Sequence, residues 1–378
     1  MRLKIEKYQN KLSAIGNWSI YPKPQRKFKF CIVVPCYSES NIISNLLDSI
    51  LLQNKKLLKE MAVIIVVNNS VDASNEIVND NFKTIDIIAD YRGKLNIYYI
   101  DAFSEQYALS KKKSGVGFSR KLGVDKFIPY LFKDSLICFT DADVILDPSY
   151  LTEINNFHAR TRCSAFLVGF KHQKSSNQLI NKYIVEYEKF LKDTAKSIKD
   201  AGSIYGYVSI GSCMGCTFEA YIAVGGMPAM KATEDFYFLQ ALSKYQKIMH
   251  IKKEIVFPSS RNELRIHLGT GFRINQLLNG LDIKDLYYSK KSYVYLKSVL
   301  SVLNLSWYDS IEETSKKLRC ISNEILIFFQ NENFAEYLIK IKINVSTEDQ
   351  YINQVNRWFD GLKTIQFLNF FSNKNRSE

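Results

Sequence analysis

Two short acidic motifs in the sequence contain the residue types found at reaction sites. The first is Asp141-Ala142-Asp143, which follows an apolar run at 136–139. Two carboxylates this close repel each other unless a cation lies between them. Their hard oxygen atoms suit Mg²⁺ or Mn²⁺, which proteins usually share with substrate phosphates. The motif therefore indicates either a metal site that serves phosphates or a turn whose aspartates bond to the backbone.

The second acidic motif is Thr233-Glu234-Asp235, at the start of a predicted helix over 234–245. A carboxylate here has the chemistry of a general base that accepts a proton from an attacking hydroxyl. Acidic residues are also common at helix starts, where they cap the helix and interact favourably with its dipole. Both interpretations stay open for this motif on its own.

An alternation of strands and helices must position these motifs. Short apolar, β-branched runs predict buried strands, and stretches with one apolar face predict helices. Near-continuous apolar strands that alternate with helices are typical of a parallel sheet covered on both faces. The predicted strands are 30–34, 63–67, 97–100, 136–139 and 251–257, and the predicted helices are 41–52, 74–82, 116–130, 179–199 and 234–245.

The alternation stops near residue 280. Beyond it, three amphipathic stretches predict helices over 289–305, 311–330 and 350–368. We therefore expect three parts: an N-terminal lead-in over 1–29, an α/β domain over 30–280 and a helical C-terminal region over 281–378. The C-terminal helices suit packing or partner binding better than a lipid-binding face.

Polar residues follow three of the predicted strands. They are Pro35-Cys36-Tyr37-Ser38-Glu39, Asn68-Asn69-Ser70-Val71-Asp72 and Thr140-Asp141-Ala142-Asp143. In an open α/β sheet, ligands bind at the carboxyl ends of the strands. No GxGxxG or GxxxxGK[ST] motif follows the first strand, which argues against a dinucleotide site and a P-loop.

The composition is that of a globular protein with a basic charge balance. The chain has 378 residues, 46% hydrophobic and 24% charged, which excludes intrinsic disorder and fibrous repeats. Its net charge of +13 suits nucleic acid, an anionic membrane face or phosphate-bearing ligands, or else reflects a solvated lysine-rich surface. Seven cysteines, an odd number, predict reduced thiols and a cytoplasmic location. We expect no secretory signal, because Met1–Lys11 is charged and lacks an apolar segment, and the longest apolar run, Met61–Val67, is too short to span a bilayer.

Five segments, in this order along the chain, resemble motifs of the family 2 glycosyltransferases, which have the GT-A fold. Phe30–Glu39 resembles the opening strand and Pro-x-Tyr turn, and Asn68-Asn69-Ser70 stands where the family usually has Asp-Asp-Gly-Ser. The other three are Gly115–Gly123 for a glycine-rich helix bearing an arginine, Phe139–Asp143 for the DxD motif, and Gly225-Gly226 with Thr233-Glu234-Asp235 for the Gly-Gly and Glu-Asp segment. The resemblance covers about 30–260. It implies a GT-A-like α/β fold, with a Rossmann-like, mostly parallel sheet.

The resemblance also implies a site for a nucleotide-diphosphate sugar. Pro35, Tyr37 and Glu39 would line the base and ribose. Asn68 and Asn69 replace acids near the base, and an asparagine can still pair with uracil, so a UDP-sugar is the first expectation. Asp141 would face the ribose and the metal, and Asp143 would bind the Mn²⁺ or Mg²⁺ ion that bridges the diphosphate. Arg120 would contact the nucleotide, unless it is a helix-surface residue.

An inverting transfer follows from the same resemblance. The departing diphosphate needs a cation, and the anomeric carbon becomes oxocarbenium-like. An acceptor hydroxyl attacks from the opposite face while Asp235 takes its proton, and Glu234 orients the acceptor or Asp235. A cationic segment over 259–271 is expected to close over the diphosphate, with Arg261 or Arg265 as a contact and His267 as a further metal ligand.

The expected acceptor is a glycan or a lipid-linked oligosaccharide of cell-surface polysaccharide synthesis. The positive charge suits an acceptor that bears phosphate, with peripheral contact at the inner membrane face and no nucleic-acid partner. One alternative is a nucleotidyltransferase, which normally has a basic, glycine-rich loop where this chain has Pro35–Asn41. The other is a non-catalytic basic protein that binds nucleic acid or a nucleotide sugar. A nucleic-acid-binding protein would cluster basic residues with exposed aromatics. A non-catalytic binder of nucleotide sugars would lack the acids that this chain retains.

Overall fold

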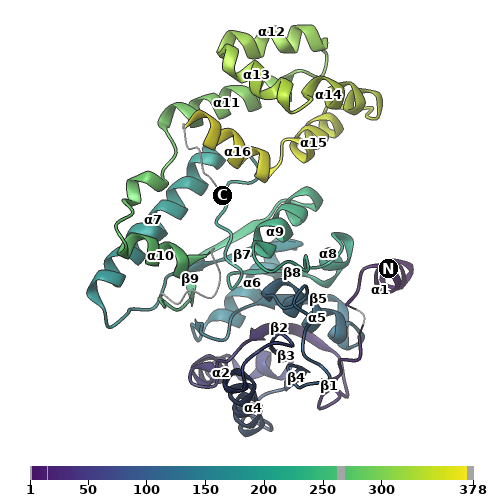
Figure 1. Cartoon of the computed structure of the whole chain (residues 1–378). Helices are drawn as coiled ribbons and strands as arrows, with labels where there is room; N and C mark the ends of the chain where they lie inside the picture. The colour runs from purple at the N-terminus through teal and green to yellow at the C-terminus, as the bar shows by residue number, and fades with distance from the viewer. Residues whose placement is uncertain (1, 15, 262–268, 373–378) are drawn as a thin grey trace. The chain divides into compact units, whose positions relative to one another are not determined.

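The computed structural model describes residues 2–14, 16–261 and 269–372, and the chain divides into two compact units (Figure 1). The first, here called the sheet unit, comprises Met1–Ile184 and Ser209–Asn275. The second, here called the helical unit, comprises Val185–Val208 and Gln276–Glu378.

A mixed sheet of nine strands forms the sheet unit within the described residues. Strands β4, β3, β2 and β5 are parallel neighbours, β8 runs antiparallel between β5 and β7, and β7 is parallel to β9. Two short antiparallel strands, β1 and β6, flank the sheet. In sheet order the strands are β1 Ile20–Tyr21, β4 Ile97–Ala102, β3 Met61–Asn68, β2 Phe28–Cys36, β5 Leu131–Phe139, β8 Met214–Thr217, β7 Ala165–Phe170, β9 Met249–Phe257 and β6 Ile145–Leu146.

Burial explains why the central strands read as continuous apolar runs. Every residue of β3 is buried, because helices cover both faces of a parallel sheet. On one face, α5 (Val116–Phe127) packs so closely that a Cβ on Gly123 would lie 2.5 Å from Val33 Cγ1. The other helices of this unit are α1 Arg2–Lys11, α2 Ile43–Leu51, α3 Lys55–Lys59, α4 Asn75–Asp90, α6 Tyr150–Thr161, α8 Phe218–Ala223, α9 Glu234–Tyr245 and α10 Thr270–Leu278, and α7 Gln178–Asp200 continues into the helical unit.

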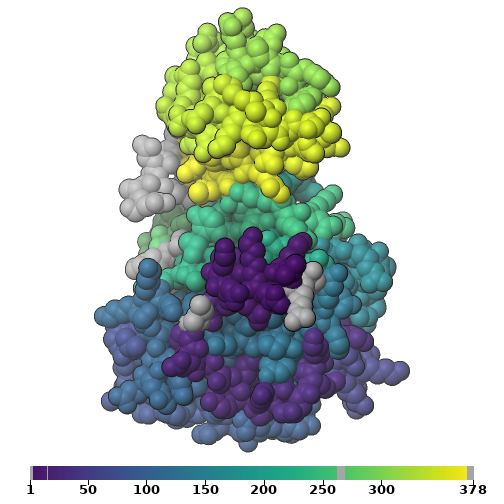
Figure 2. Space-filling view, turned by 90° about the vertical axis from the view of Figure 1, so that its right-hand side faces the viewer, coloured from purple at the N-terminus to yellow at the C-terminus, as the bar shows by residue number. Residues whose placement is uncertain are grey.

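The N-terminal helix α1, purple in Figure 2, lies on the surface of the sheet unit and packs against α8. A buried polar network anchors it. Tyr8 donates to Asp125 Oδ1 at 2.6 Å and accepts from Lys121 Nζ at 2.7 Å. Lys121 in turn lies 3.2 Å from Asp125 Oδ2. No helix was predicted in this lead-in, because its residues form no strong apolar stripe.

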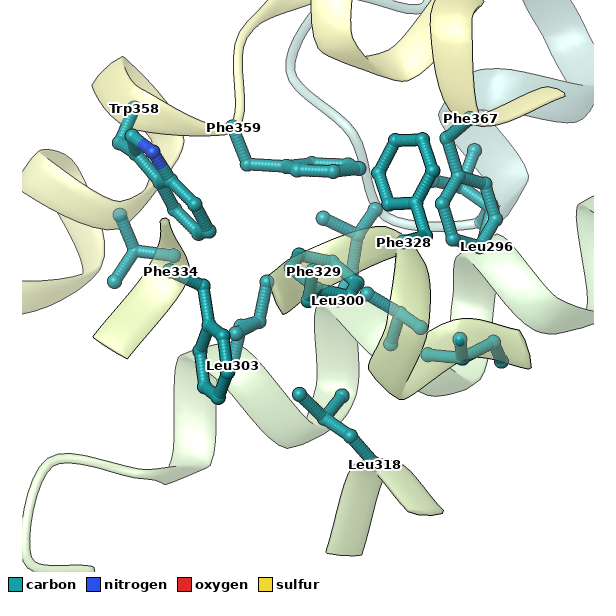
Figure 3. Packing of buried hydrophobic residues seen from close by; sticks show 14 of the residues in the cluster. Leu296, Leu300, Leu303, Leu318, Phe328, Phe329, Phe334, Trp358, Phe359 and Phe367 are labelled. Atoms are coloured by element: carbon teal, nitrogen blue, oxygen red, sulfur yellow. The ribbon is translucent and has the colours of Figure 1, made fainter. Parts of the chain in front are cut away.

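The helical unit has an aromatic core (Figure 3). Phe329 lies at its centre, fully buried, with the rings of Phe334, Trp358, Phe359 and Phe367 around it. The helices that supply this core are α11 Lys290–Leu305, α12 Ile311–Ile321, α13 Asn323–Asn331, α14 Phe334–Ile343, α15 Glu348–Trp358 and α16 Gly361–Phe371.

The mostly parallel α/β sheet and the helical C-terminal region are confirmed. Two long helices were predicted wrongly. The stretch 311–330 breaks at Ser322, whose side chain accepts from Glu324 N and caps a new helix. The stretch 350–368 breaks at Asp360, which caps α16 in the same way. Within the described residues, no helix is long and apolar enough to cross a bilayer.

Candidate active site

Strand pairing brings the predicted site residues to one edge of the sheet. Cys36 at the end of β2 pairs with Val67 near the end of β3, and Val33 pairs with Phe139 at the end of β5. Asn68 ends β3, and the loops that leave the three strands carry Tyr37 and Glu39, Asn69, and Asp141 and Asp143. The polar residues that follow the three strands therefore lie together at one edge of the sheet, as their positions after the strands predicted.

A buried arginine joins the two acidic motifs. Arg120, on α5, is 2% exposed, so it is not a surface helix residue. Its Nη2 donates to Asp141 and its Nη1 to Glu234, so one guanidinium joins the end of β5 to the start of α9. A planar guanidinium with several donors can hold two carboxylates at once, which a lysine cannot do with the same geometry.

Two glycines make room for this bridge. A Cβ on Gly211 would lie 2.4 Å from Arg120 Nη1, which is shorter than a van der Waals contact allows. A Cβ on Gly117 would lie 2.8 Å from the Cβ of Glu234 and 2.5 Å from the Pro228 carbonyl oxygen. Both positions must therefore lack a side chain for Arg120 and Glu234 to meet.

Burial alters the acidity of the bridge. It raises the pKa of Glu234 to about 7, while the neighbouring Arg120 opposes the rise and Asp235 adds to it. Burial alone would lower the pKa of Arg120, but Asp141 and Glu234 outweigh it and raise that pKa. Arg120 therefore stays charged, and the carboxylate of Glu234 is held in the ion pair with it.

Asp235 is presented differently from its neighbour. It is half-buried in the first turn of α9, where its Oδ1 accepts from the Phe236 amide at 2.8 Å. The residue before the pair, Thr233, has a φ of +63°, which is unusual for a β-branched residue. Thr233 makes no side-chain cap bond to the helix. The backbone there aims Glu234 inward while Asp235 keeps partial access to solvent.

A second arginine holds the other carboxylates of the edge. Arg261 donates to both oxygens of Glu39, at 3.0 and 3.1 Å, and its Nη2 lies 2.7 Å from Asp143 Oδ2. Glu39 is 7% exposed, and Asp143 is about one-fifth exposed. The predicted metal ligand Asp143 is thus paired with the Arg261 guanidinium in this structure.

The donor set suits a divalent ion only in a shared site. Within the described ranges, no group of three His, Cys, Asp or Glu side chains is placed to hold a metal. Mg²⁺ and Mn²⁺ sites in phosphate-handling proteins commonly take one or two carboxylates and complete their shell with phosphate oxygens and water. Asp141 and Asp143 fit that pattern. Arg265 and His267, the other predicted contacts, lie outside the described residues.

The two asparagines of the edge differ in what they can offer a ligand. Asn68 donates through Nδ2 to the carbonyls of Cys36 and Val66, each at 3.0 Å, so its oxygen is the group it can present. Asn69 uses both ends, since Nδ2 donates to Ser70 and Phe103 while Oδ1 accepts from Asn81. Asn69 therefore ties loops together, whereas Asn68 retains an acceptor. Nearby, Pro35 is half-buried and Tyr37 is 39% exposed.

Two residues that shape the site, Asn81 and Gly211, were not predicted as site residues. Asn81 lies on α4, fully buried, and no motif marks it. The closeness of Gly211 to Arg120 could not be read from the sequence, because the two residues are far apart along the chain. A polar residue at a core position of a helix was the one available signal for Asn81.

Comparisons with known proteins show the family of this chain. The model of the family described as "Glycosyl transferase family 2" matches residues 31–225, while no match is found among curated proteins. Similar solved structures include Staphylococcus aureus TarS 1–349, with 15% identity over 88% of this chain and 91% of that chain and a TM-score of 0.46. The complex of TarS 1–349 with UDP-GlcNAc has 18% identity over 90% and 82% and a TM-score of 0.45. Mannosyltransferase PcManGT from Pyrobaculum calidifontis, in complex with GDP-Man and Mn²⁺, has 13% identity over 95% of each chain and a TM-score of 0.43. Because the family model covers more than half of the sequence, this chain belongs to glycosyl transferase family 2 and is a glycosyltransferase with a GT-A-like sheet.

Proposed function

We propose that the chain is an inverting, metal-dependent glycosyltransferase that moves a sugar from a nucleotide-diphosphate donor to a hydroxyl group. The observation that carries this proposal is the Arg120 bridge. By binding Asp141 and Glu234 together, it sets the proposed donor acids beside the helix that carries Asp235. A donor phosphate and an acceptor hydroxyl could then meet at the same edge of the sheet.

The donor would lie over the ends of β2, β3 and β5. Tyr37 is exposed enough to pack against a base, with Pro35 beside it. The Asn68 oxygen is a hydrogen-bond acceptor, which complements the N3–H of uracil. A UDP-sugar is therefore the first donor to test. Glu39 is held by Arg261, so it would reach the ribose only if that pair opens.

Asp143 and Asp141 are the residues that would hold Mn²⁺ or Mg²⁺. Such an ion, when bound, would neutralise the charge that develops on the departing diphosphate. Arg261 is the cation already at this position, and we propose that it would turn to the diphosphate when the donor binds. His267 and Arg265 stay as proposed contacts on the neighbouring segment.

Asp235 is the proposed base. The acceptor oxygen forms a bond to the anomeric carbon from the face opposite the diphosphate, and the bond from that carbon to the phosphate oxygen breaks. The acceptor proton passes to the Asp235 carboxylate, and the electron pair leaves with the nucleoside diphosphate. Attack from the opposite face inverts the anomeric configuration. Glu234 positions this carboxylate through α9, because its own carboxylate is bound to Arg120.

The acceptor proposed is a glycan or a lipid-linked oligosaccharide used in cell-surface polysaccharide synthesis. A net charge of +13 suits an acceptor that bears phosphate. A cytoplasmic enzyme with peripheral contact at the inner membrane face would fit such an acceptor.

Slow donor hydrolysis tests the chemistry without a known acceptor. The protein is incubated with a panel of nucleotide sugars and Mn²⁺, and proton NMR follows the anomeric signal of the released sugar. We expect one donor to give first the anomer opposite to that of the donor, and Asp235→Asn to abolish release. Glu219→Gln is the matched control, because Glu219 is a first-turn acid of the neighbouring helix α8. Retention of configuration, or equal activity of Asp235→Asn and Glu219→Gln, would contradict the proposal.

A further inference from the structure

Three buried asparagines tie together the strand ends at the proposed donor site. Asn81 on α4 is fully buried, and its Oδ1 accepts from the Ser38 amide at 3.0 Å. Its Nδ2 donates to Asn69 Oδ1 at 2.8 Å and reaches the Asn68 carbonyl at 3.4 Å. Asn69 continues the network to the Phe103 carbonyl after β4. One helix side chain thus links the loop after β2 to the end of β3, and Asn69 extends the link to the segment after β4.

The loop held by Asn81 has an uncommon backbone. Ser38 has a φ of +53°, in the left-handed region that residues other than glycine avoid unless surrounding contacts hold them there. The preceding residue in the sequence of α4 reinforces the contact, because Asp80 accepts from both the amide and the hydroxyl of Ser40. The turn that separates Tyr37 from Glu39 is therefore clamped from α4.

This conformation decides where two proposed donor contacts point. On one side of Ser38, Tyr37 stays 39% exposed; on the other, Glu39 is buried and forked to Arg261. If the Ser38 amide loses its acceptor, the strained turn can relax towards ordinary φ values, and both side chains move. The Asn81 contacts therefore affect the positions of Tyr37 and Glu39 as well as the stability of α4.

We propose that Asn81 is a positioning residue for the donor site: it holds the Ser38 turn and the Asn68–Asn69 loop in the arrangement that receives the nucleotide. The inference rests on the proposed function, since it assumes that a nucleoside diphosphate binds at this edge. Asn81 is fully buried, so it would act through Ser38 and Asn69 rather than by touching the nucleotide. Its loss should weaken donor binding while leaving the base, Asp235, in place.

The test compares Asn81→Ala with Asn96→Ala. Asn96 is a matched control, because its Nδ2 also donates to carbonyls, those of Leu58 and Met61, but it precedes β4 at the opposite edge of the sheet. The readouts are the calorimetric Kd for UDP and the other nucleoside diphosphates, and the split between KM and kcat in donor hydrolysis. Where Asn81→Ala does not fold, Asn81→Asp takes its place. It keeps an oxygen for Ser38 but sets a second oxygen against Asn69 Oδ1.

We expect Asn81→Ala to raise the Kd and the KM about tenfold or more, as loss of two buried hydrogen bonds implies, with kcat within about twofold of wild type. Asn96→Ala should lower the thermal midpoint but leave the Kd within about twofold of wild type. Equal effects of the two variants on the Kd, or a fall in kcat with an unchanged KM, would overturn the inference. If wild type binds no nucleoside diphosphate, the proposed function itself fails. If wild type binds and Asn81→Ala binds equally well, only this inference fails.

Discussion

Replacing Arg120 with methionine removes the charge of the buried bridge and keeps much of the side-chain volume. Arg120 is 2% exposed, and its partner Glu234 is 4% exposed, so a lone Glu234 carboxylate would have little access to water. Breaking a buried ion pair by removing one partner costs about 3–5 kcal/mol. Asp141 is 37% exposed and water can compensate it, so most of the loss should come from Glu234. We expect Arg120→Met to lose about 3 kcal/mol at pH 7.5.

The loss should depend on pH in a defined direction. Burial already raises the pKa of Glu234 from 4.5 to about 7, and Arg120 opposes that rise. Without Arg120, the folded-state pKa should rise further. A folded pKa above the unfolded value gives stability that is fully present below about pH 4.5 and lost as the pH rises through the folded pKa. The variant should therefore lie closest to wild type near pH 5 and fall furthest behind above pH 7.

Hydrogen exchange of amides in β2, β3 and α5 measures this loss in the sheet unit, separately from the helical unit. Exchange at pH 5 and pH 8, corrected for intrinsic rates, gives the opening free energy at each pH. Lys253→Met is the control, because it removes an exposed ion pair with Glu153 and should change little. A loss below about 1 kcal/mol at pH 8, or an equal loss at both pH values, would refute the bridge as described.

Three further predictions concern separate parts of the structure. Arg261→Ala removes the cation paired with Asp143, so paramagnetic resonance should show about tenfold tighter binding of Mn²⁺ alone, together with weaker binding of nucleoside diphosphate; unchanged Mn²⁺ affinity would contradict the pairing. Thr233→Asn places a residue that tolerates positive φ at +63°, so thermal unfolding should show about 1 kcal/mol more stability, and a loss would argue against backbone strain there. Phe329→Ala opens a cavity in the core of the helical unit, where urea unfolding should show a loss of about 3–5 kcal/mol; less than 1 kcal/mol would contradict its central position.

Much of the fold can be predicted from the sequence where burial leaves a strong pattern. The all-buried strand β3 reads as an uninterrupted apolar run, and α9 begins and ends where its pattern predicts. Short or glycine-containing strands carry less signal. Both β7 (Ala165–Phe170) and β8 (Met214–Thr217) were missed, although β8 inserts antiparallel beside β5.

The candidate site was predictable as a set of residues but not as a set of contacts. The acids after β5 and at the start of α9 stand out by type and spacing. Arg120 lies 21 residues from Asp141 and 114 from Glu234, so only the folded chain reveals their pairing. The same holds for Asn81, whose partners lie on loops of other strands. The local sequence pattern indicates which residues are buried and which secondary structure they form. These contacts instead join residues that only the folded chain brings together.

The most direct measurement of the central claim is thermal unfolding with a panel of nucleoside diphosphates, in Mn²⁺ and in EDTA. A ligand that binds only the folded chain raises the midpoint by mass action. We predict a metal-dependent rise with one diphosphate, UDP first, that is kept in Asp235→Asn and lost in Asp143→Asn. No rise with any diphosphate, or a rise that Asp143→Asn leaves unchanged, would contradict a metal-assisted donor site at the ends of β2, β3 and β5.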